Sequence, residues 1–302
     1  MPSRRQIREA VVQFLYCADL EGGENPVSLR EPFWDFITES DRRSLQVATF
    51  RTVYHLAHGR ESRLVEFIER ATSAEALLSA WPEAEHLKID LKRIVEQESA
   101  WSTAFAKLER LPKDDDDASV AENFGSALDA LFAIDRDLAA NRNRFLQGIE
   151  DHPALRGQLE AVAASVRRMQ RISDRLRMVE EPEKFPEQSD LSKLRDTKSS
   201  LTELRQSSDE LVDRILTQKE EIDKALVAVV ENYSPERIDP VDRAILRLGT
   251  YELVFASTPP KVVINEGIEL AKRFGTTDSR RFVNGVLDRV AKKHVPQTSE
   301  NP

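Results

Sequence analysis

The chain has 302 residues, enough for one large domain or two ordinary ones. Glycine accounts for only 10 of them, less than half of the roughly 7% that is usual, which argues against a turn-rich β sandwich or barrel. Charged residues make up 32% of the chain and apolar residues 40%, a balance typical of helices with one apolar stripe. The single cysteine, Cys17, excludes an internal disulfide and a cysteine-rich zinc site.

The two ends of the chain are basic and the middle is acidic, while the net charge is −9. Residues 1–16 sum to +2 and residues 261–294 to +4, whereas residues 17–208 sum to −9. Local sites for an anionic ligand are therefore compatible with an acidic chain, since binding depends on the local field. No apolar run is long enough to cross a membrane, and the charged N-terminus does not resemble a secretion signal, so we expect a cytoplasmic protein.

Amphipathic helices are predicted along most of the chain. The apolar spacing predicts a first helix over 4–20, which the glycines and proline of 21–26 end. Trp81-Pro82 marks a break, and the four adjacent aspartates in 111–119 predict a solvated linker. Further helical segments are predicted at 33–37, 47–59, 63–71, 87–111 and 120–150.

A heptad-like run of apolar residues extends from Leu155 to Val179. Its spacings alternate between four and three, which is typical of a helix seam. After a proline-containing turn at 180–190, a second run extends from Leu191 to Ile215. We predict that the two runs pack as an antiparallel hairpin, because polar residues interrupt the second seam. A coiled coil between two copies of the chain is the alternative.

The last third of the chain has clear helix boundaries. Asp239-Pro240 supplies a side-chain cap followed by a first-turn proline. The helix that follows is apolar on nearly every side, which predicts burial, and Gly249 within it indicates the close approach of another helix. The tail at 296–302 is expected to be disordered. The helices predicted here are 241–256, 261–275 and 276–294.

Three segments in the same order closely resemble the bacterial transcription antitermination factor NusB family. They are SRRQIREAVVQFLYCADL at 3–20, ELVDRILTQKEEIDKALVAVVENYSPERIDPVDRAILRLGTYEL at 210–253 and LRLGTYELVFASTPPKVVINEGIELAKRFGTTDSRRFVNGVLDRVAKKH at 246–294. The strings PKVVINEGIELAK and FVNGVLD are the most specific of them. Members of this family are about one domain long, so this chain is much longer than they are.

The resemblance implies an all-α fold of two small helical bundles. From the apolar spacing we expect a long helical insertion, partly a coiled-coil hairpin, to interrupt that fold here. The helix caps and apolar stripes found in the residues agree with an all-helical fold. We predict family-like N-terminal helices at 1–40 and an insert of unassigned role at 41–208. Family-like C-terminal helices are predicted at 209–295, and the tail at 296–302.

Cationic and aromatic residues come together at the start of the first predicted helix. Arg4, Arg5 and Arg8 lie on its first turns, with Tyr16 two turns further along. Guanidinium groups bind phosphate oxygens, and an aromatic ring beside them can stack on an unpaired base. A second basic group surrounds the turn at Gly275, where two helix ends can converge on one phosphate. Ordinary solvated charges and a core tyrosine are the alternative interpretation.

The resemblance implies that these residues bind the boxA segment of leader RNA. We expect arginines from the two chain ends, such as Arg5 and Arg281, to lie side by side as a cradle for an unpaired strand. The candidate RNA-binding residues are Arg4, Arg5, Arg8, Gln13, Tyr16, Lys272, Arg273, Arg280, Arg281 and Asn284.

The family also implies protein partners. NusE, a ribosomal small-subunit protein, is basic, so an acidic surface would complement it, and Glu252 and Glu266 are the candidates. Other Nus factors and RNA polymerase would be contacted indirectly, and the chain itself would be a monomer or a homodimer. No metal or cofactor is expected, because His55 and His58 lack further ligands at suitable spacing.

The sequence indicates a protein that is not an enzyme, since it lacks the GxGxxG, GxxxxGK[ST] and GxSxG motifs. The family-like function would be transcription antitermination in ribosomal RNA operons, by assembly of RNA and protein. The alternative is a helical scaffold protein whose acidic insert binds another protein.

Overall fold

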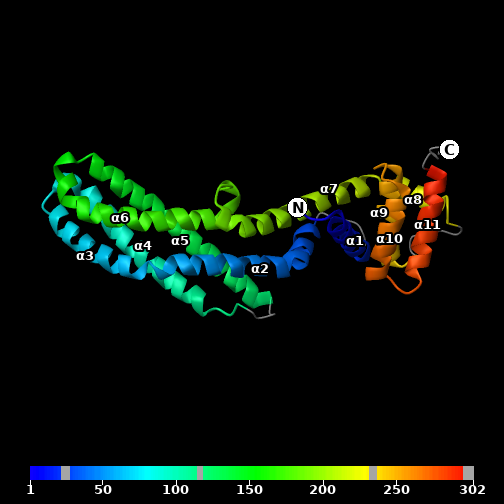
Figure 1. Ribbon diagram of the computed structural model, residues 1–302, viewed down its shortest axis with the longest axis horizontal. Coiled ribbons are helices and arrows are strands. Elements are labelled where there is room, and N and C mark those ends of the chain that lie inside the picture. Colours follow the sequence, from blue (N-terminus) through cyan, green and yellow to red (C-terminus); the bar gives the residue numbers. More distant parts are fainter. Residues whose placement is uncertain (22–27, 114–117, 231–236, 295–302) are drawn as a thin grey trace. The chain divides into compact units, whose positions relative to one another are not determined.

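A computed structural model describes residues 1–21, 28–113, 118–230 and 237–294 (Figure 1). Within these ranges all regular secondary structure is helical, which confirms the all-α prediction. The tail predicted at 296–302 lies outside them. The α-helices are α1 (Arg4–Leu20), α2 (Arg30–His58), α3 (Glu61–Leu78), α4 (Glu85–Arg110), α5 (Ala118–Glu150), α6 (Pro153–Glu180), α7 (Ser192–Thr217), α8 (Lys219–Val227), α9 (Pro240–Val254), α10 (Pro260–Phe274) and α11 (Ser279–His294).

Short 3-10 helices occupy the predicted breaks of the chain. The first follows Trp81, and two more lie in the turn expected at 180–190. None of the described helices combines the length and the apolar character needed to cross a membrane. The 3-10 helices are η1 (Pro82–Ala84), η2 (Pro182–Lys184) and η3 (Ser189–Leu191).

The chain divides into two compact units, each with its own hydrophobic core. Unit 1 comprises Met1–Glu39 and Ser199–Pro302, and unit 2 comprises Ser40–Lys198. The first and last parts of the chain therefore form one unit, and the segment between them forms the other.

Helices α2 and α7 each contribute to both cores. In α2, Trp34 lies in the core of unit 1 and Val53 in the core of unit 2. In α7, Ile215 lies in the core of unit 1 and Leu194 lies in the core of unit 2. Apolar residues that serve two cores do not follow a single stripe. This is why the sequence pattern predicts two short segments where α2 forms one continuous helix.

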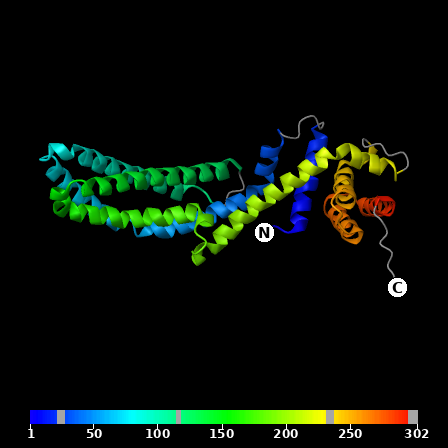
Figure 2. The same cartoon turned by 90° about the horizontal axis from the view of Figure 1, so that it is seen from above.

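Unit 2 is a helical bundle in which α4 packs along α5 and the face of α6 meets α3 and α5 (Figures 1 and 2). The predicted pairing of α6 with α7 is therefore wrong. A seam spacing determines which face of a helix is apolar, but not which helix covers it. The heptad-like run is buried throughout, at Leu155, Leu159, Val162, Val166, Met169, Leu176 and Val179.

Helix α9 is the central helix of unit 1, since it contacts α1, α8, α10 and α11. Burial of 11 of its 15 residues follows from this position. The Asp239 side chain caps α9 by accepting a hydrogen bond from the Val241 backbone N–H at 2.9 Å, as predicted. A methyl group at Gly249 would lie 2.7 Å from Leu287 Cδ2 of α11, which confirms the predicted close approach.

Candidate nucleic-acid interface

The start of α1 is fixed by a capping box. Ser3 Oγ accepts a hydrogen bond from the Gln6 backbone N–H, and Gln6 Oε1 accepts one from the Ser3 N–H at 2.8 Å. Arg4 and Arg5 therefore lie on the first turn of α1, where both are exposed. Arg4 forms no ion pair with any residue that the structure describes.

Arg8 is buried against α9, in contrast to its predicted position on an RNA-binding surface. Its Nε donates to Glu252 Oε1 at 2.9 Å, and the two side chains are only 8% and 10% exposed. Burial raises the pKa of Glu252, and the nearby Arg8 guanidinium opposes that shift. The pair attaches α1 to α9. Arg8 is therefore not presented to a phosphate, and Glu252 is not presented to a protein partner.

A second group of ion pairs holds the other end of α1. Asp19 accepts hydrogen bonds from Arg243 Nε at 2.7 Å and from Arg247 Nη1 at 2.8 Å, and Arg247 also pairs with Asp223 of α8 at 3.0 Å. Because Arg8 meets the end of α9 and Asp19 meets its beginning, the two helices run antiparallel. Sequence reasoning missed this group, which the charged residues inside the apolar stretch of α9 could have indicated.

Cations and carboxylates alternate where α1 lies beside α10. Arg5 Nη2 donates to Glu266 Oε1 at 2.7 Å, and Arg273 Nη1 donates to Glu9 Oε1 at 2.6 Å. The Arg5 hydrogen bond lowers the pKa of Glu266. The expected cradle of arginines alone is therefore wrong, because Glu9 and Glu266 occupy the space between them. Glu266 faces Arg5 rather than a protein partner.

The remaining predicted residues surround the turn between α10 and α11. Lys272 pairs with Glu269 one turn before it on α10. Arg280, Arg281 and Asn284 are exposed at the start of α11, and the structure shows no ion pair between either arginine and a described residue. Helices α9 and α10 lie between α1 and α11 in both views (Figures 1 and 2). The cations of α11 therefore form a patch separate from Arg4 and Arg5.

An apolar groove of about 370 Å³ lies along α1, and it includes two of the predicted residues, Gln13 and Tyr16. Phe36, which is 77% exposed, and Phe274 lie on it as well. The Arg273 guanidinium carbon lies 5.4 Å from the Phe274 ring centroid, so a cation borders the aromatic surface. The groove is lined by Val12, Gln13, Tyr16, Cys17, Phe33, Phe36, Ile37, Val241 and Phe274.

Sequence reasoning placed the three phenylalanines of this groove within predicted helices but did not connect them with a binding surface, because only the fold brings these helices together. Burial raises the pKa of the Cys17 thiol, so this group is protonated at neutral pH and is not an activated nucleophile. Across the described ranges, no three histidine, cysteine, aspartate or glutamate side chains gather in an arrangement that could hold a metal ion.

Comparison with known proteins identifies a family. Residues 160–292 match the NusB family, and the match begins within α6. The transcription antitermination protein NusB of Geobacter sulfurreducens is 49% identical over 88 residues, which are 29% of this chain and 64% of that protein. Its counterpart in Thermotoga maritima is 51% identical over 77 residues, which are 25% of this chain and 54% of that protein. The chain thus spans 54% to 64% of the length of these two relatives.

A solved structure of T. maritima NusB aligns with 38% of this chain and with 84% of its own, at 36% identity. The TM-score is 0.31, which is too low for a comparison of the folds.

Proposed function

This chain belongs to the NusB family through its domain at residues 160–292, and we propose that it is an RNA-binding transcription antitermination factor. Proteins that carry the name transcription antitermination protein NusB are about half identical to it over the matched region. We propose that it acts by assembly rather than by catalysis. It would hold boxA-like leader RNA and NusE together during transcription of ribosomal RNA operons.

The arrangement of guanidinium groups and aromatic rings along α1 is the observation that supports RNA binding. Arg4 and Arg5 lie on the first turn, and Tyr16 lies about three turns further along, roughly 16 Å away along the helix axis. Tyr16 shares its groove with Phe36 and Phe274. In the proposed complex, phosphates of a single strand contact the arginines and an unpaired base enters the groove.

The ion pairs at this surface can be exchanged for contacts with phosphate. Arg5 and Arg273 are 51% and 62% exposed in their pairs with Glu266 and Glu9. The carboxylates of these pairs are less exposed, at 18% and 13%, but water and salt reach the guanidinium groups and weaken both pairs. Arg8 is the exception, since its pair is buried. The proposed RNA-binding surface therefore consists of Arg4, Arg5, Gln13, Tyr16 and Arg273.

Lys272, Arg280, Arg281 and Asn284 form a second patch at the turn between α10 and α11. We propose that it binds further phosphates, because the exposed cations lie where the N–H groups at the start of α11 add donors. NusE is proposed from the family alone. Since Glu252 and Glu266 face α1 arginines, its contacts would involve other residues. We assign RNA binding to unit 1 and regard unit 2 as an added helical part.

Fluorescence anisotropy with labelled single-stranded RNA tests this function. The wild-type chain should prefer RNA that contains boxA to a scrambled strand of equal composition. Arg4→Ala combined with Arg5→Ala should weaken binding about tenfold and reduce the slope of log Kd against log salt concentration by about one to two. Tyr16→Ala should weaken boxA binding by roughly tenfold, as expected for a lost stacking contact.

The matched control is Arg63→Ala combined with Arg110→Ala in unit 2. Both of these arginines are exposed and form no ion pair with a described residue. The control should leave the affinity and the salt slope unchanged. Equal affinity and equal slope for the control, the Arg4/Arg5 variant and the wild type would contradict the proposal.

A further inference from the structure

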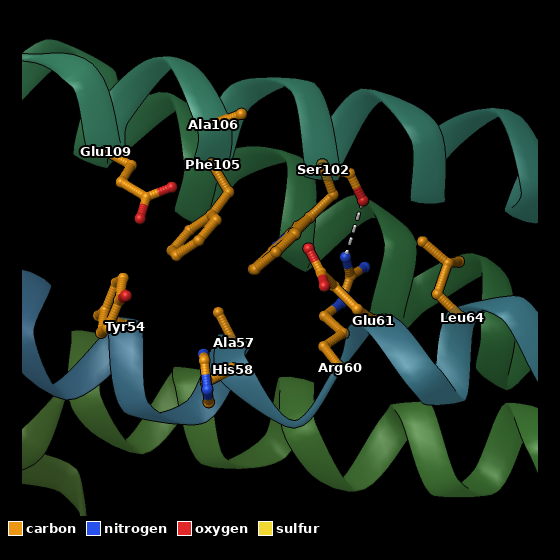
Figure 3. A pocket seen from close by; sticks show the side chains of 11 residues that line it. Tyr54, Ala57, His58, Arg60, Glu61, Leu64, Ser102, Phe105, Ala106 and Glu109 are labelled. Atoms are coloured by element: carbon orange, nitrogen blue, oxygen red, sulfur yellow. Dashed lines mark hydrogen bonds between the residues drawn. The ribbon is translucent and has the colours of Figure 1, made fainter.

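Unit 2 contains a pocket of about 300 Å³ that is independent of the RNA-binding surface. It lies between the end of α2, the start of α3 and the second half of α4 (Figure 3). Tyr54, Trp101 and Phe105 give it aromatic walls, and Ala57 and Leu64 add small apolar surfaces. A cavity of this size accommodates one large side chain or a small ligand.

The aromatic walls form a row of roughly parallel rings. The centroids of Trp101 and Phe105 are 5.3 Å apart with an interplanar angle of 10°, and those of Phe105 and Tyr54 are 6.2 Å apart with an angle of 29°. At one end of the row, the Arg60 guanidinium carbon lies 3.7 Å from the Trp101 ring centroid. The pocket wall thus already shows a guanidinium stacked on an aromatic ring.

Arg60 itself cannot supply a free positive charge to a ligand, because it belongs to a buried network. Its guanidinium pairs with Glu98, which also pairs with Arg142, and Arg142 donates to Ser173 at 2.7 Å. Ser173 in turn donates to Asp135 at 2.9 Å. Burial lowers the pKa of Arg60 to about 10, so it stays charged at neutral pH. Two arginines and two carboxylates therefore balance each other behind the pocket.

Two carboxylates lie at the mouth of the pocket, together with the imidazole of His58. Glu61 and Glu109 line it, both are exposed, and neither forms an ion pair with a described residue. Figure 3 shows both carboxylates in the space between α4 and the turn from α2 to α3, with the Phe105 ring between them. Carboxylates beside aromatic faces attract a cation and repel a phosphate. The pocket therefore favours a positively charged ligand over an RNA strand.

An exposed apolar stripe continues from the pocket along α3. Val65 is 59% exposed and Ile68 is 42% exposed. They lie four and seven residues after Glu61, so all three share one face of the helix. A free small cation would leave these side chains in water, whereas a polypeptide that enters the pocket can cover them. The stripe therefore favours a protein ligand.

We propose that this pocket binds an arginine side chain of a basic protein segment. The guanidinium stacks on Phe105 and Tyr54 and pairs with Glu61 and Glu109, and apolar residues of the same segment cover the stripe on α3. Arginine fits better than lysine, because its planar group can stack and can pair with carboxylates at the same time. Unit 2 is then a docking module, separate from the RNA-binding surface of unit 1.

The test uses the full chain and a fluorescein-labelled seven-residue peptide that alternates arginine and leucine. Anisotropy should report saturable binding, and a peptide with citrulline in place of arginine should bind at least tenfold more weakly. Glu61→Gln combined with Glu109→Gln should weaken binding of the arginine peptide at least tenfold. Tyr54→Ala should weaken it at least threefold.

The matched control is Glu122→Gln combined with Asp151→Asn, which removes the same charge from exposed positions elsewhere in unit 2 that form no ion pair within the described part of the chain. This control should bind the peptide within twofold of the wild type. Thermal unfolding by circular dichroism checks that each variant is folded. If the double variant is unfolded, Glu109→Gln alone replaces it.

Three results would overturn the proposal. They are equal binding of the citrulline peptide, an equal loss in the control variant, and loss of single-stranded RNA binding on Tyr54→Ala, which would assign the pocket to RNA. Glu61→Gln combined with Glu109→Gln should leave the affinity for boxA RNA unchanged. Failure of the arginine-binding proposal is therefore distinguishable from failure of the RNA-binding function.

Discussion

The groove on α1 and the pocket in unit 2 are both aromatic, but opposite charges surround them. Tyr16, Phe36 and Phe274 line the groove, and Arg273 borders it. The pocket is bordered instead by carboxylates that form no ion pair with any residue the structure describes. Aromatic surface alone therefore does not identify a ligand. The local charge separates a groove suited to a nucleotide strand from a pocket suited to a cationic side chain.

The buried ion pairs of unit 2 also differ from the ion pairs at the proposed RNA-binding surface of unit 1. In unit 2, Glu98 and Arg142 are each 1% exposed, and one carboxylate holds two guanidinium groups. In unit 1, the arginine of the pair between Arg5 and Glu266 is half-exposed. Buried pairs cannot exchange partners without a large cost in free energy, whereas exposed pairs can. Substitutions in both units test this difference, and the most deeply buried pair should give the largest effect.

Glu98→Gln should have the largest effect, because it leaves two buried guanidinium groups without their shared negative charge. We expect the free energy of unfolding to fall by about 3–5 kcal/mol. Urea unfolding followed by circular dichroism measures this change. Glu96→Gln, at an exposed position on the same helix, should change it little. Equal midpoints for the two variants would mean that the network does not stabilise unit 2.

In unit 1, Glu252→Gln should lower the free energy of unfolding less than Glu98→Gln does in unit 2. The amide still offers Arg8 an acceptor, and Glu266 Oε2 lies 3.8 Å from Arg8 Nη1. We expect a loss of about 1–3 kcal/mol, as for a weakened buried hydrogen bond. The same urea titration applies. A loss as large as that of Glu98→Gln would show that depth of burial does not set the cost.

Glu266→Gln should increase the affinity for boxA RNA, because it frees Arg5 from its carboxylate. Since exposed pairs are weak, we expect a gain of only about two- to fivefold. Anisotropy titration measures it. Glu220→Gln on α8 removes the same charge from an exposed position that has no ion pair among the described residues, and it serves as the control. A gain that is equal in both variants would reflect net charge rather than release of Arg5.

The smallest effect should be on the pH dependence of stability. The hydrogen bond from Arg5 lowers the pKa of Glu266 in the folded state. The pair therefore stabilises the fold fully above the ordinary glutamate pKa, and this contribution disappears as the pH falls through the lowered pKa. Urea midpoints of wild type and Glu266→Gln should differ slightly at pH 7 and converge once the pH falls below the lowered pKa of Glu266. A constant difference between the midpoints would contradict this linkage.

Features that depend on neighbouring residues were predictable from the sequence. The Asp239 cap and the buried seam of α6 both follow from residues within a few helical turns, and the tight spacing at Gly249 follows from the missing side chain. The seam also shows the limit of such reasoning. It indicated burial correctly, while the helices that cover it, α3 and α5, come from other parts of the chain.

The candidate site was only partly predictable, because its charges are balanced over long distances in sequence. The acceptors of Arg5 and Arg8 are 261 and 244 residues away. The sum of charges over the chain ends treated these arginines as free. Sequence reasoning also placed Glu252 and Glu266 on an open surface. The pocket in unit 2 gave no local signal either, since Tyr54 and Trp101 come from helices that only the fold brings together.

The division of unit 1 into two distant stretches sets an order of events during synthesis. Helix α1 packs on α9, which begins about 220 residues after α1 ends. At ribosomal rates of roughly 5–20 residues per second, the apolar face of α1 is without its partner for about 10–40 s. All of unit 2 is translated during that interval. A nascent chain can thus complete its second unit first, while the apolar face of α1 stays uncovered by α9 until α9 leaves the ribosome.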